Sequence, residues 1–283
     1  MSRIAYVNGA YAPLARAGVS ILDRGFQFAD SIYEVWAIRD GRWFDAEAHM
    51  ARLKRSLAEL RMAPPMAERA LWAVMRETVR RNRVAWGIVY VQISRGAAPR
   101  DHVFPAADTK PTIIVTAKNI DRAALAKRAE TGVKVISVPE QRWARCDIKT
   151  VNLLPNVLAR QQAKEAGAFE AWFVDAEGFV TEGTSSNAFI VDAEGRIRTR
   201  ALSNAILHGV TRAALIDIAE ARQLTVLEQP FTLEEAKTAR EAFISAASNP
   251  AVPVIAIDGV QVGDGKPGAV ARALRATYLG AEA

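Results

Sequence analysis

One lysine lies in surroundings that suit covalent chemistry. Lys149 sits among apolar residues in the stretch 145–154. Desolvation there would lower the pKa of its amine, and the free amine is the nucleophile that Schiff-base formation requires. Taken alone, the stretch is more typical of a lysine that snorkels from a strand edge, so other residues must decide between the two interpretations.

A carboxylate and several small hydroxyls share a second stretch, residues 180–189. Glu182 stands in a turn that also contains Ser186. A carboxylate in such a turn can bond a protonated ring nitrogen, and the neighbouring hydroxyls can position it. A polar hairpin tip explains this stretch equally well when it is taken alone.

Two further stretches suit the binding of an anion. Residues 207–212 open a predicted helix, in which Gly209 permits close backbone approach and Thr211 lies in the first turn. Helix N-termini bind phosphate through free amides and the helix dipole, although a simple capped helix is more common. Residues 244–250 place small side chains before a proline, which suits a tight turn whose amides face an anion.

Other kinds of site are disfavoured. His49, His102 and His208 show no metal-ligand spacing, so no metal is expected. The glycine-rich residues 259–268 do not fit the spacing of a phosphate-binding loop and are interpreted as a turn. Cys146 is more typical of a buried structural thiol than of a nucleophile.

Composition indicates an ordinary globular protein. The 283 residues are 50% hydrophobic and 24% charged, with a formal net charge of +6. The basic residues alternate with acidic ones, which disfavours nucleic acid as a partner, but a basic nucleic-acid-binding protein remains the alternative from a different class. The single cysteine, the polar N-terminus and the lack of a long apolar run predict a cytoplasmic protein without a membrane span.

The pattern of strands and helices predicts an α+β protein of two domains. We expect a small N-terminal α/β domain over residues 1–118, an interdomain linker over 119–131, and a large C-terminal domain over 132–283 that carries Lys149. Two turns of identical sequence, 175–178 and 192–195, are expected to join three strands into a meander. The predicted helices span residues 46–61, 67–82, 154–166, 211–222 and 269–279.

Taken together, the four stretches are similar in kind and order to those of fold-type IV enzymes that use pyridoxal 5′-phosphate (PLP). That family includes D-amino-acid and branched-chain aminotransferases, (R)-selective amine transaminases and aminodeoxychorismate lyases. The resemblance covers nearly the whole chain. It implies a two-domain α+β fold, an active site between the domains, and PLP as the cofactor.

The resemblance also implies a role for each matching residue. Lys149 would form the Schiff base and carry the proton, and Glu182 would face the pyridine nitrogen. Ala247 stands where relatives often have threonine, so only its backbone amide can help to hold the phosphate. The remaining implied cofactor contacts are Arg52, Ser186, Leu207, Gly209, Val210 and Thr211.

Two more stretches make D-amino-acid aminotransferases the closest group. Tyr33 takes the position of a substrate-side tyrosine, and Ser248 lies in the turn at residues 244–250 as a further substrate contact. Residues 94–104 are similar to the loop in which an arginine and a histidine, here Arg100 and His102, capture the substrate carboxylate. The resemblance further implies a homodimer in which this loop reaches the neighbouring active site.

The expected reaction is ping-pong transamination between a D-amino acid, such as D-alanine or D-glutamate, and a 2-oxo acid. Branched-chain L-amino-acid aminotransferase and (R)-amine transaminase remain alternatives with the same cofactor site. Aminodeoxychorismate lyase is a further alternative.

Overall fold

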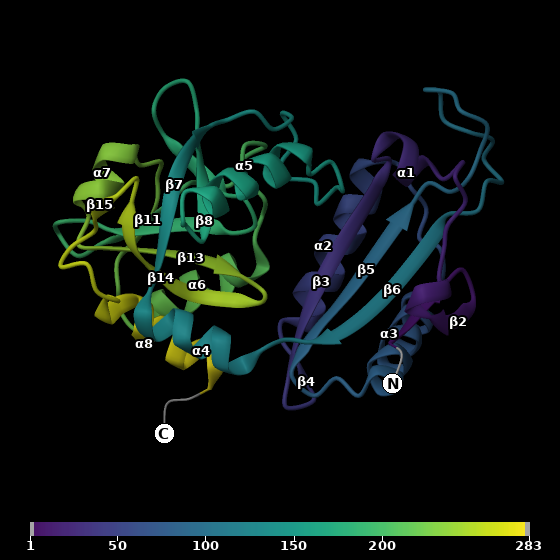
Figure 1. The fold of residues 1–283 in the computed structure, drawn as a ribbon, viewed down its shortest axis with the longest axis horizontal. Coiled ribbons are helices and arrows are strands. Elements are labelled where there is room, and N and C mark those ends of the chain that lie inside the picture. Colours follow the sequence, from purple (N-terminus) through teal and green to yellow (C-terminus); the bar gives the residue numbers. More distant parts are fainter. Residues whose placement is uncertain (1–2, 281–283) are drawn as a thin grey trace. The chain divides into compact units, whose positions relative to one another are not determined.

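A computed structural model describes residues 3–280, which fall into two compact units. Unit 1 runs to Asp121 and also takes in Ile148–Asn152, while unit 2 starts at Arg122 and resumes at Leu153 after that insertion. Figure 1 labels the elements of both units.

Unit 1 is built on a six-stranded antiparallel sheet with the strand order β2-β1-β6-β5-β3-β4. The Asn8-Gly9 turn closes the hairpin of β1 and β2, as the sequence predicts. Its strands are β1 (Ile4–Val7), β2 (Ala10–Pro13), β3 (Ser31–Arg39), β4 (Arg42–Trp43), β5 (Gly87–Ser94) and β6 (Thr112–Asn119); its helices are η1 (Leu14–Arg16), α1 (Arg24–Phe28), α2 (Ala46–Glu59) and α3 (Glu68–Asn82).

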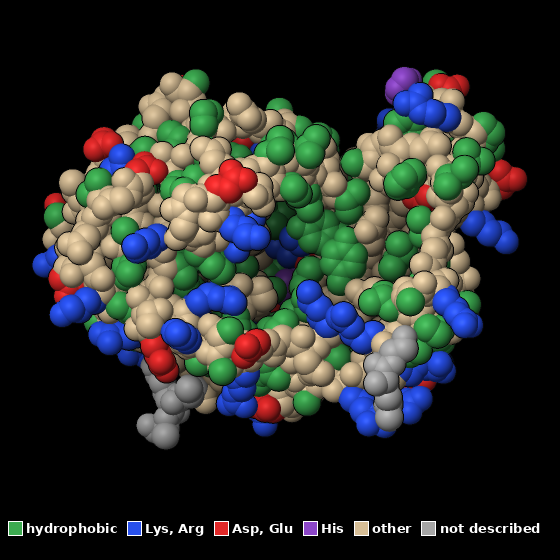
Figure 2. Space-filling model, viewed as in Figure 1, with side chains coloured by type: hydrophobic (Ala, Val, Ile, Leu, Met, Phe, Trp, Pro, Cys, Tyr) green, Lys and Arg blue, Asp and Glu red, His purple; other side chains and the backbone are tan. Residues whose placement is uncertain are grey.

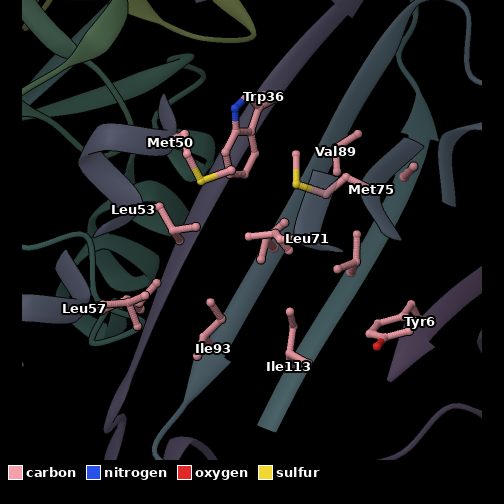
Figure 3. Packing of buried hydrophobic residues seen from close by; sticks show 14 of the residues in the cluster. Tyr6, Trp36, Met50, Leu53, Leu57, Leu71, Met75, Val89, Ile93 and Ile113 are labelled. Carbon is pink, nitrogen blue, oxygen red and sulfur yellow. The ribbon is translucent and has the colours of Figure 1, made fainter. Parts of the chain in front are cut away.

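The core of unit 1 forms where α2 and α3 pack on one face of the sheet (Figure 3). Every second residue of β5 is buried, which is the period of a strand with one covered face. Leu53 and Leu57 of α2 recur at helical spacing and are almost fully buried, as is Met75 of α3. Because alternate side chains point to opposite faces, Tyr33 and Tyr90 lie on the other face, where their rings stack 5.5 Å apart.

A short segment from later in the chain completes this sheet. The Tyr33 amide donates to the Lys149 carbonyl at 2.9 Å, and the Val151 amide donates to the Ser31 carbonyl at 3.1 Å. Strand β4 pairs only with the far end of β3, so the edge at Ser31 is open to this pairing. Lys149 is therefore held by backbone bonds to β3.

Unit 2 is built on a nine-stranded mixed sheet with the order β12-β11-β10-β13-β14-β7-β8-β9, in which β15 pairs with β14. Its strands are β7 (Val133–Pro139), β8 (Glu170–Val174), β9 (Val180–Gly183), β10 (Asn187–Val191), β11 (Ile197–Thr199), β12 (Val226–Glu228), β13 (Glu241–Ala246), β14 (Asn249–Ile257) and β15 (Val260–Gln261). Its helices are α4 (Arg122–Thr131), α5 (Leu154–Glu165), α6 (Val210–Ala221), α7 (Leu233–Thr238) and α8 (Ala269–Leu279).

The structure differs from the expected domain boundaries in two places. Residues 119–131, expected to be a linker, contain the end of β6 and helix α4, which buries Leu125 and Ala129 one turn apart. Alanine, arginine and lysine favour helix, and here that propensity decides the structure of a charged stretch. Lys149 was expected in the C-terminal domain, but its contacts place it in unit 1.

The predicted three-stranded meander is wrong, because the two identical turns serve different hairpins. One joins β8 to β9 and the other joins β10 to β11, while β9 and β10 are not neighbours in the sheet order. The turn between β9 and β10 bonds elsewhere: the hydroxyls of Thr184, Ser185 and Ser186 all donate to Glu170.

Charged side chains are distributed as the sequence suggests. Figure 2 shows Lys and Arg side chains scattered over the visible face of both units, with acidic side chains among them. Among the described residues, no helix is long and apolar enough to cross a membrane.

The packing of α2 on the sheet can be tested with Leu53, which is 2% exposed. Replacing a buried leucine with alanine removes transfer free energy and leaves a cavity, so Leu53→Ala should lower the free energy of unfolding by about 3 kcal/mol. The control Leu14→Ala, at a side chain 41% exposed, should change it by less than about 0.5 kcal/mol. Urea denaturation followed by tryptophan fluorescence measures both, and equal losses would contradict the packing.

Candidate active site

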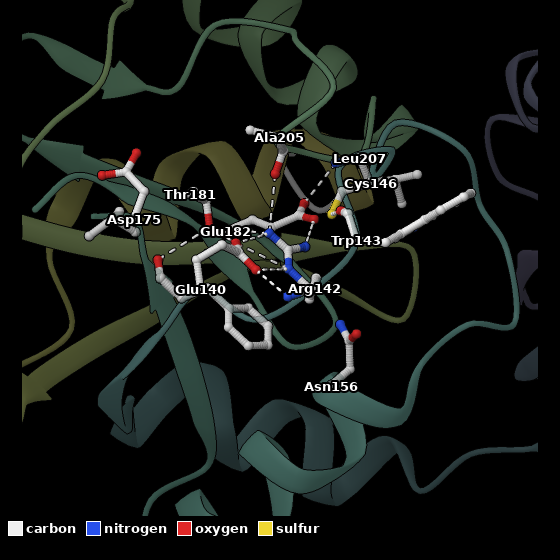
Figure 4. Close-up of polar contacts among 12 residues, drawn as sticks. Glu140, Arg142, Trp143, Cys146, Asn156, Asp175, Thr181, Glu182, Ala205 and Leu207 are labelled. Carbon is white, nitrogen blue, oxygen red and sulfur yellow. Dashed lines mark hydrogen bonds and ion pairs between the residues drawn. The ribbon is translucent and has the colours of Figure 1, made fainter. Parts of the chain in front are cut away.

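Glu182 of β9 is a buried carboxylate whose two oxygens are both held (Figure 4). Its Oε2 accepts from the Leu207 amide at 3.0 Å and from Asn187 Nδ2 at 3.1 Å. Its Oε1 accepts from Arg142 Nη1 in a charge-assisted hydrogen bond. These donors stabilise the ionised carboxylate, which is the form that can face a protonated ring nitrogen.

Arg142 is the centre of a small charged network. Its Nη2 donates to Glu140 Oε2 at 2.6 Å and to the Ala205 carbonyl at 3.1 Å. Burial alone would lower the pKa of the Arg142 guanidinium, but the charges of Glu182 and Glu140 raise it above its ordinary value. Arg142 therefore stays charged and balances Glu182 inside the unit.

The same carboxylate organises the entrance to helix α6. The Leu207 amide donates to Glu182, and the Leu207 carbonyl accepts from Asn187 Nδ2 at 3.0 Å. A Cβ on Gly209 would lie 2.0 Å from Asn187 Oδ1, so a larger residue cannot stand there without displacing Asn187. Glycine at this position thus lets the chain pass close to the Asn187 amide before α6 begins.

The N-terminus of α6 fits the phosphate that the sequence predicts. Gly209 is the N-cap residue and supplies no side-chain cap, so the first amides of the helix, those of Val210 and Thr211 among them, are available. The Thr211 hydroxyl is buried and has no hydrogen-bond partner within residues 3–280. An orphaned buried hydroxyl beside a helix N-terminus is the donor set that a phosphate ester requires.

Ser186 is engaged by a second buried carboxylate. Its hydroxyl donates to Glu170 Oε2 at 2.6 Å, and Glu170 is fully buried. Since the hydroxyl hydrogen is used in that bond, Ser186 Oγ can only accept from a ligand while the bond persists. Glu170 thereby fixes the turn that follows Glu182.

The predicted tight turn at residues 244–250 is present as a two-residue connection. Ala246 pairs with Asn249 across the hairpin of β13 and β14, which leaves Ala247 and Ser248 at its tip. The side chain of Asn249 donates to Ser248 Oγ at 3.1 Å. Both tip residues are half-buried.

In unit 1, the structure brings Lys149 and Tyr33 together. Lys149 Nζ lies 4.2 Å from the centre of the Tyr33 ring. Lys149 is half-buried, and its backbone is fixed to β3. The amine is thus directed to the tyrosine-bearing face of the sheet, away from the helices.

Arg52 of α2 lies in a buried cluster on the helix-covered side of the same sheet. Its Nε and Nη2 donate to the two oxygens of Glu34 at 2.9 and 2.7 Å, and His49 Nδ1 lies 3.0 Å from Glu34 Oε1. Burial alone would raise the pKa of Glu34, but the Arg52 charge and the hydrogen bonds from Arg52 and His49 hold it well below its usual range. Glu34 therefore orients two of the three Arg52 nitrogens.

Arg100 and His102 meet on one aromatic ring. The Arg100 guanidinium lies 5.0 Å from the centre of the Phe28 ring, and the His102 ring centre lies 5.4 Å from it. Both side chains are exposed. Unit 1 thus brings the two predicted carboxylate-binding residues together.

Within the described residues, the candidate site contains neither a reactive thiol nor a group of metal ligands. Burial raises the pKa of the Cys146 thiol to about 12, and its Sγ donates to the Trp143 carbonyl at 3.1 Å. Cys146 is therefore a protonated thiol at neutral pH, but it is half-buried rather than buried as expected. No group of three or more His, Cys, Asp or Glu side chains in residues 3–280 could hold a metal ion.

Several residues that hold the site were missed by the sequence analysis. Asn187 lies within residues 180–189, and Glu34 lies next to Tyr33. Each is a polar side chain in an otherwise apolar strand, and this pattern could have identified them. Arg142 gave no local signal, because its partner Glu182 lies 40 residues further along the chain.

Comparison with known proteins gives one consistent family. The model of the amino-transferase class IV family matches residues 31–257. The chain is 40% identical to a D-alanine aminotransferase of Staphylococcus haemolyticus over 270 residues, which is 95% of this chain and 94% of that protein. It is 38% identical to a D-alanine aminotransferase of Bacillus licheniformis over 261 residues, 92% and 90% of the two chains.

Solved structures agree with this. A T.th. branched-chain amino acid aminotransferase with pyridoxamine 5′-phosphate has a TM-score of 0.89 at 28% identity and covers 99% of this chain and 94% of its own. The branched-chain amino acid aminotransferase of Escherichia coli shares the fold with a TM-score of 0.87 at 24% identity and the same coverage. The matched family model spans both units and includes Lys149, Glu182 and Thr211, and on this evidence the chain belongs to the class IV aminotransferases.

Proposed function

We propose that the chain is a PLP-dependent aminotransferase that acts on D-amino acids, of which D-alanine and D-glutamate are the first candidates, with a 2-oxo acid as acceptor. The observation that carries the proposal is the Glu182 carboxylate, which is paired with Arg142 and bonded to the chain that opens the uncapped helix α6. Strand β9 thus offers a carboxylate for a pyridine nitrogen, and α6, to which it is hydrogen-bonded through Leu207, offers amides for a phosphate. The D-alanine aminotransferases at 38–40% identity support the choice of substrate.

Each residue has a defined part in this proposal. When bound, PLP supplies the aldehyde carbon that takes the amino group and the ring that delocalises the electron pair left on the substrate. Lys149 holds the cofactor covalently and, as a free amine, takes the proton from the substrate Cα. Glu182 keeps the ring nitrogen protonated.

The phosphate would be held by the amides of Val210, Thr211 and Ala247, the hydroxyl of Thr211 and the guanidinium of Arg52. Leu207 and Gly209 let the chain approach the cofactor, and Ser186 lies in the turn that follows Glu182 as a further contact. Tyr33, Ser248, Arg100 and His102 would bind the substrate, with the arginine and histidine on its carboxylate.

The first experiment adds PLP to the purified protein and records the visible spectrum, then adds D-alanine or L-leucine separately. We expect a visible band from the bound cofactor that D-alanine alone converts to the pyridoxamine form, with pyruvate released and the band restored by 2-oxoglutarate. Lys149→Ala should abolish both the band and the conversion, whereas Lys134→Ala, at an exposed lysine, should change neither.

Other outcomes would redirect the assignment. Conversion by L-leucine rather than D-alanine would favour the branched-chain alternative, and conversion by (R)-1-phenylethylamine the amine transaminases. Pyruvate release from aminodeoxychorismate without an amino acceptor would favour the lyase. A protein that binds no PLP at all would refute the proposal.

The close approach of the chain to Asn187 at Gly209 gives a sharper test of cofactor binding. Because a Cβ there would meet Asn187 Oδ1 at 2.0 Å, Gly209→Ala should disturb the Asn187 bonds to Glu182 and Leu207. We expect PLP to bind roughly tenfold more weakly, a loss of about 1.4 kcal/mol. Gly18→Ala, where nothing lies within 4 Å of the added methyl group, is the control. Titration of the apoprotein with PLP measures both, and identical affinities would contradict the geometry.

We also propose that the protein acts as a homodimer in which the loop carrying Arg100 and His102 reaches the neighbouring active site. Unit 1 exposes large apolar side chains on Ile21 and Phe26, which are 78% and 73% accessible. One side of α5 in unit 2 exposes Leu154, Val157 and Leu158, each more than half accessible. A second copy of the chain would cover such surfaces, which monomeric proteins rarely expose.

Sedimentation velocity tests the dimer. Leu158→Asp places a charge on the apolar side of α5 and should shift the protein toward monomer, because burying an unpaired carboxylate in an interface is costly. Gln162→Asp, at an exposed polar position of the same helix, should leave the dimer intact. A wild-type protein that sediments as a monomer at micromolar concentration would refute the dimer.

A further inference from the structure

The loop that carries Arg100 and His102 is held by a buried arginine from α1. Arg24 is 4% exposed, and its Nη1 donates to the carbonyls of Asp101 at 2.6 Å and Val103 at 3.2 Å. Its Nε donates to Asp30 Oδ2 at 2.8 Å, which balances the charge. Arg24 thus clamps the loop backbone on either side of His102.

The Phe28 ring, one helical turn after Arg24, is the surface on which the loop side chains are ordered. The Arg24 guanidinium lies 4.9 Å from the ring centre, close to the 5.0 Å of Arg100. The His102 ring is inclined to the Phe28 ring by 46°. One aromatic side chain therefore contacts the clamp and both of the predicted carboxylate ligands.

The ends of the loop are fixed by Arg95, which shares Asp30 with Arg24. Arg95 Nε and Nη2 donate to the two oxygens of Asp30 at 2.7 and 2.9 Å, so Asp30 is shared by Arg95 and Arg24. The Arg95 guanidinium also lies 3.7 Å from the centre of the Phe104 ring. In between, the side chains of residues 99–103 are all exposed.

Arg100 has no carboxylate partner that would compete with a substrate. Within residues 3–280, no Asp or Glu side chain forms an ion pair or hydrogen bond with it, and its contact is with the Phe28 ring. An exposed loop pays conformational entropy when its side chains are ordered on binding. A ring that already orders Arg100 and His102 removes part of that cost.

We propose that Arg24 and Phe28 are positioning residues that preorganise Arg100 and His102 to capture the α-carboxylate of the substrate. This proposal rests on the function proposed above, because it explains how the two residues that would bind the substrate carboxylate are aligned. Arg24 fixes the backbone of the loop, and Phe28 fixes the directions of the two side chains. Neither residue is proposed to touch the substrate.

The test measures single-turnover conversion of the PLP-loaded protein as a function of D-alanine concentration. Phe28→Leu removes the ring and should raise the apparent dissociation constant of D-alanine about tenfold, while the maximal rate stays within about twofold. Phe28→Tyr keeps the ring and should behave as wild type. Phe44→Leu is the matched control, because Phe44 is also half-buried under an arginine, with the Arg39 guanidinium 4.2 Å from its ring centre.

Two additional measurements separate positioning from general damage. D-Alaninol has no carboxylate, so its slower conversion should be equal in wild type and Phe28→Leu. Amide hydrogen exchange at Ala98 and Val103, whose amides donate to the Leu22 carbonyl and to Asp101 Oδ1, should be faster in Phe28→Leu and in Arg24→Lys. A lysine has a single nitrogen, which cannot reach Asp30 and the two loop carbonyls together as the separate Nε and Nη1 atoms of arginine do. Hydrogen exchange is measured without substrate. It therefore reports on the order of the loop whichever substrate the enzyme converts.

The outcomes distinguish this proposal from the function on which it rests. If wild type converts D-alanine but Phe28→Leu matches Phe44→Leu in dissociation constant, the positioning role is refuted and the function stands. Unchanged loop exchange in both variants also refutes it. If wild type does not convert D-alanine, the proposed function fails, and with it the assignment of the loop to a substrate carboxylate. An Arg24→Lys chain that does not fold leaves the decision to the Phe28 variants.

Discussion

The ion pair between Arg142 and Glu182 is the interaction on which the proposed cofactor site depends. A buried carboxylate would normally take up a proton, and a neutral acid could not keep a ring nitrogen protonated. The charge of Arg142 favours the ionised form of Glu182, and the Leu207 amide and the Asn187 side chain direct the second oxygen. Because that amide precedes α6, a hydrogen bond ties the carboxylate to the chain that enters the helix.

The same principle recurs across the molecule. Glu34 holds Arg52, and Asp30 holds both Arg24 and Arg95. Buried ion pairs add little net stability compared with apolar packing, since desolvation offsets much of the attraction. Their contribution here is geometric. Each fork-shaped guanidinium can approach its carboxylate in few orientations, so the positions of the groups that the pair contacts are also restricted.

Local patterns in the sequence predicted the elements well and the tertiary partners poorly. The last helix, predicted over residues 269–279, has those bounds in the structure, and the Asn8-Gly9 hairpin also forms, because spacing and turn chemistry act within a few residues. The stretches around Glu182 and Thr211, which we propose to hold the cofactor, could be picked out for the same reason. Arg24 gave no such signal, since its carbonyl acceptors lie 77 and 79 residues away. The assignment of Lys149 to a domain failed because a strand-like pairing with β3 outweighed its position in the chain.

The return of Ile148–Asn152 to unit 1 has a consequence for synthesis of the chain. A ribosome that has translated the first 121 residues has not yet supplied the segment that covers the open edge of β3. Unit 1 can be completed only after the first elements of unit 2 have been synthesised. Lys149 is among the last residues of unit 1 to leave the ribosome. A gene fragment that ends at Asp121 would encode a sheet with an uncovered edge, the usual starting point for strand-to-strand aggregation.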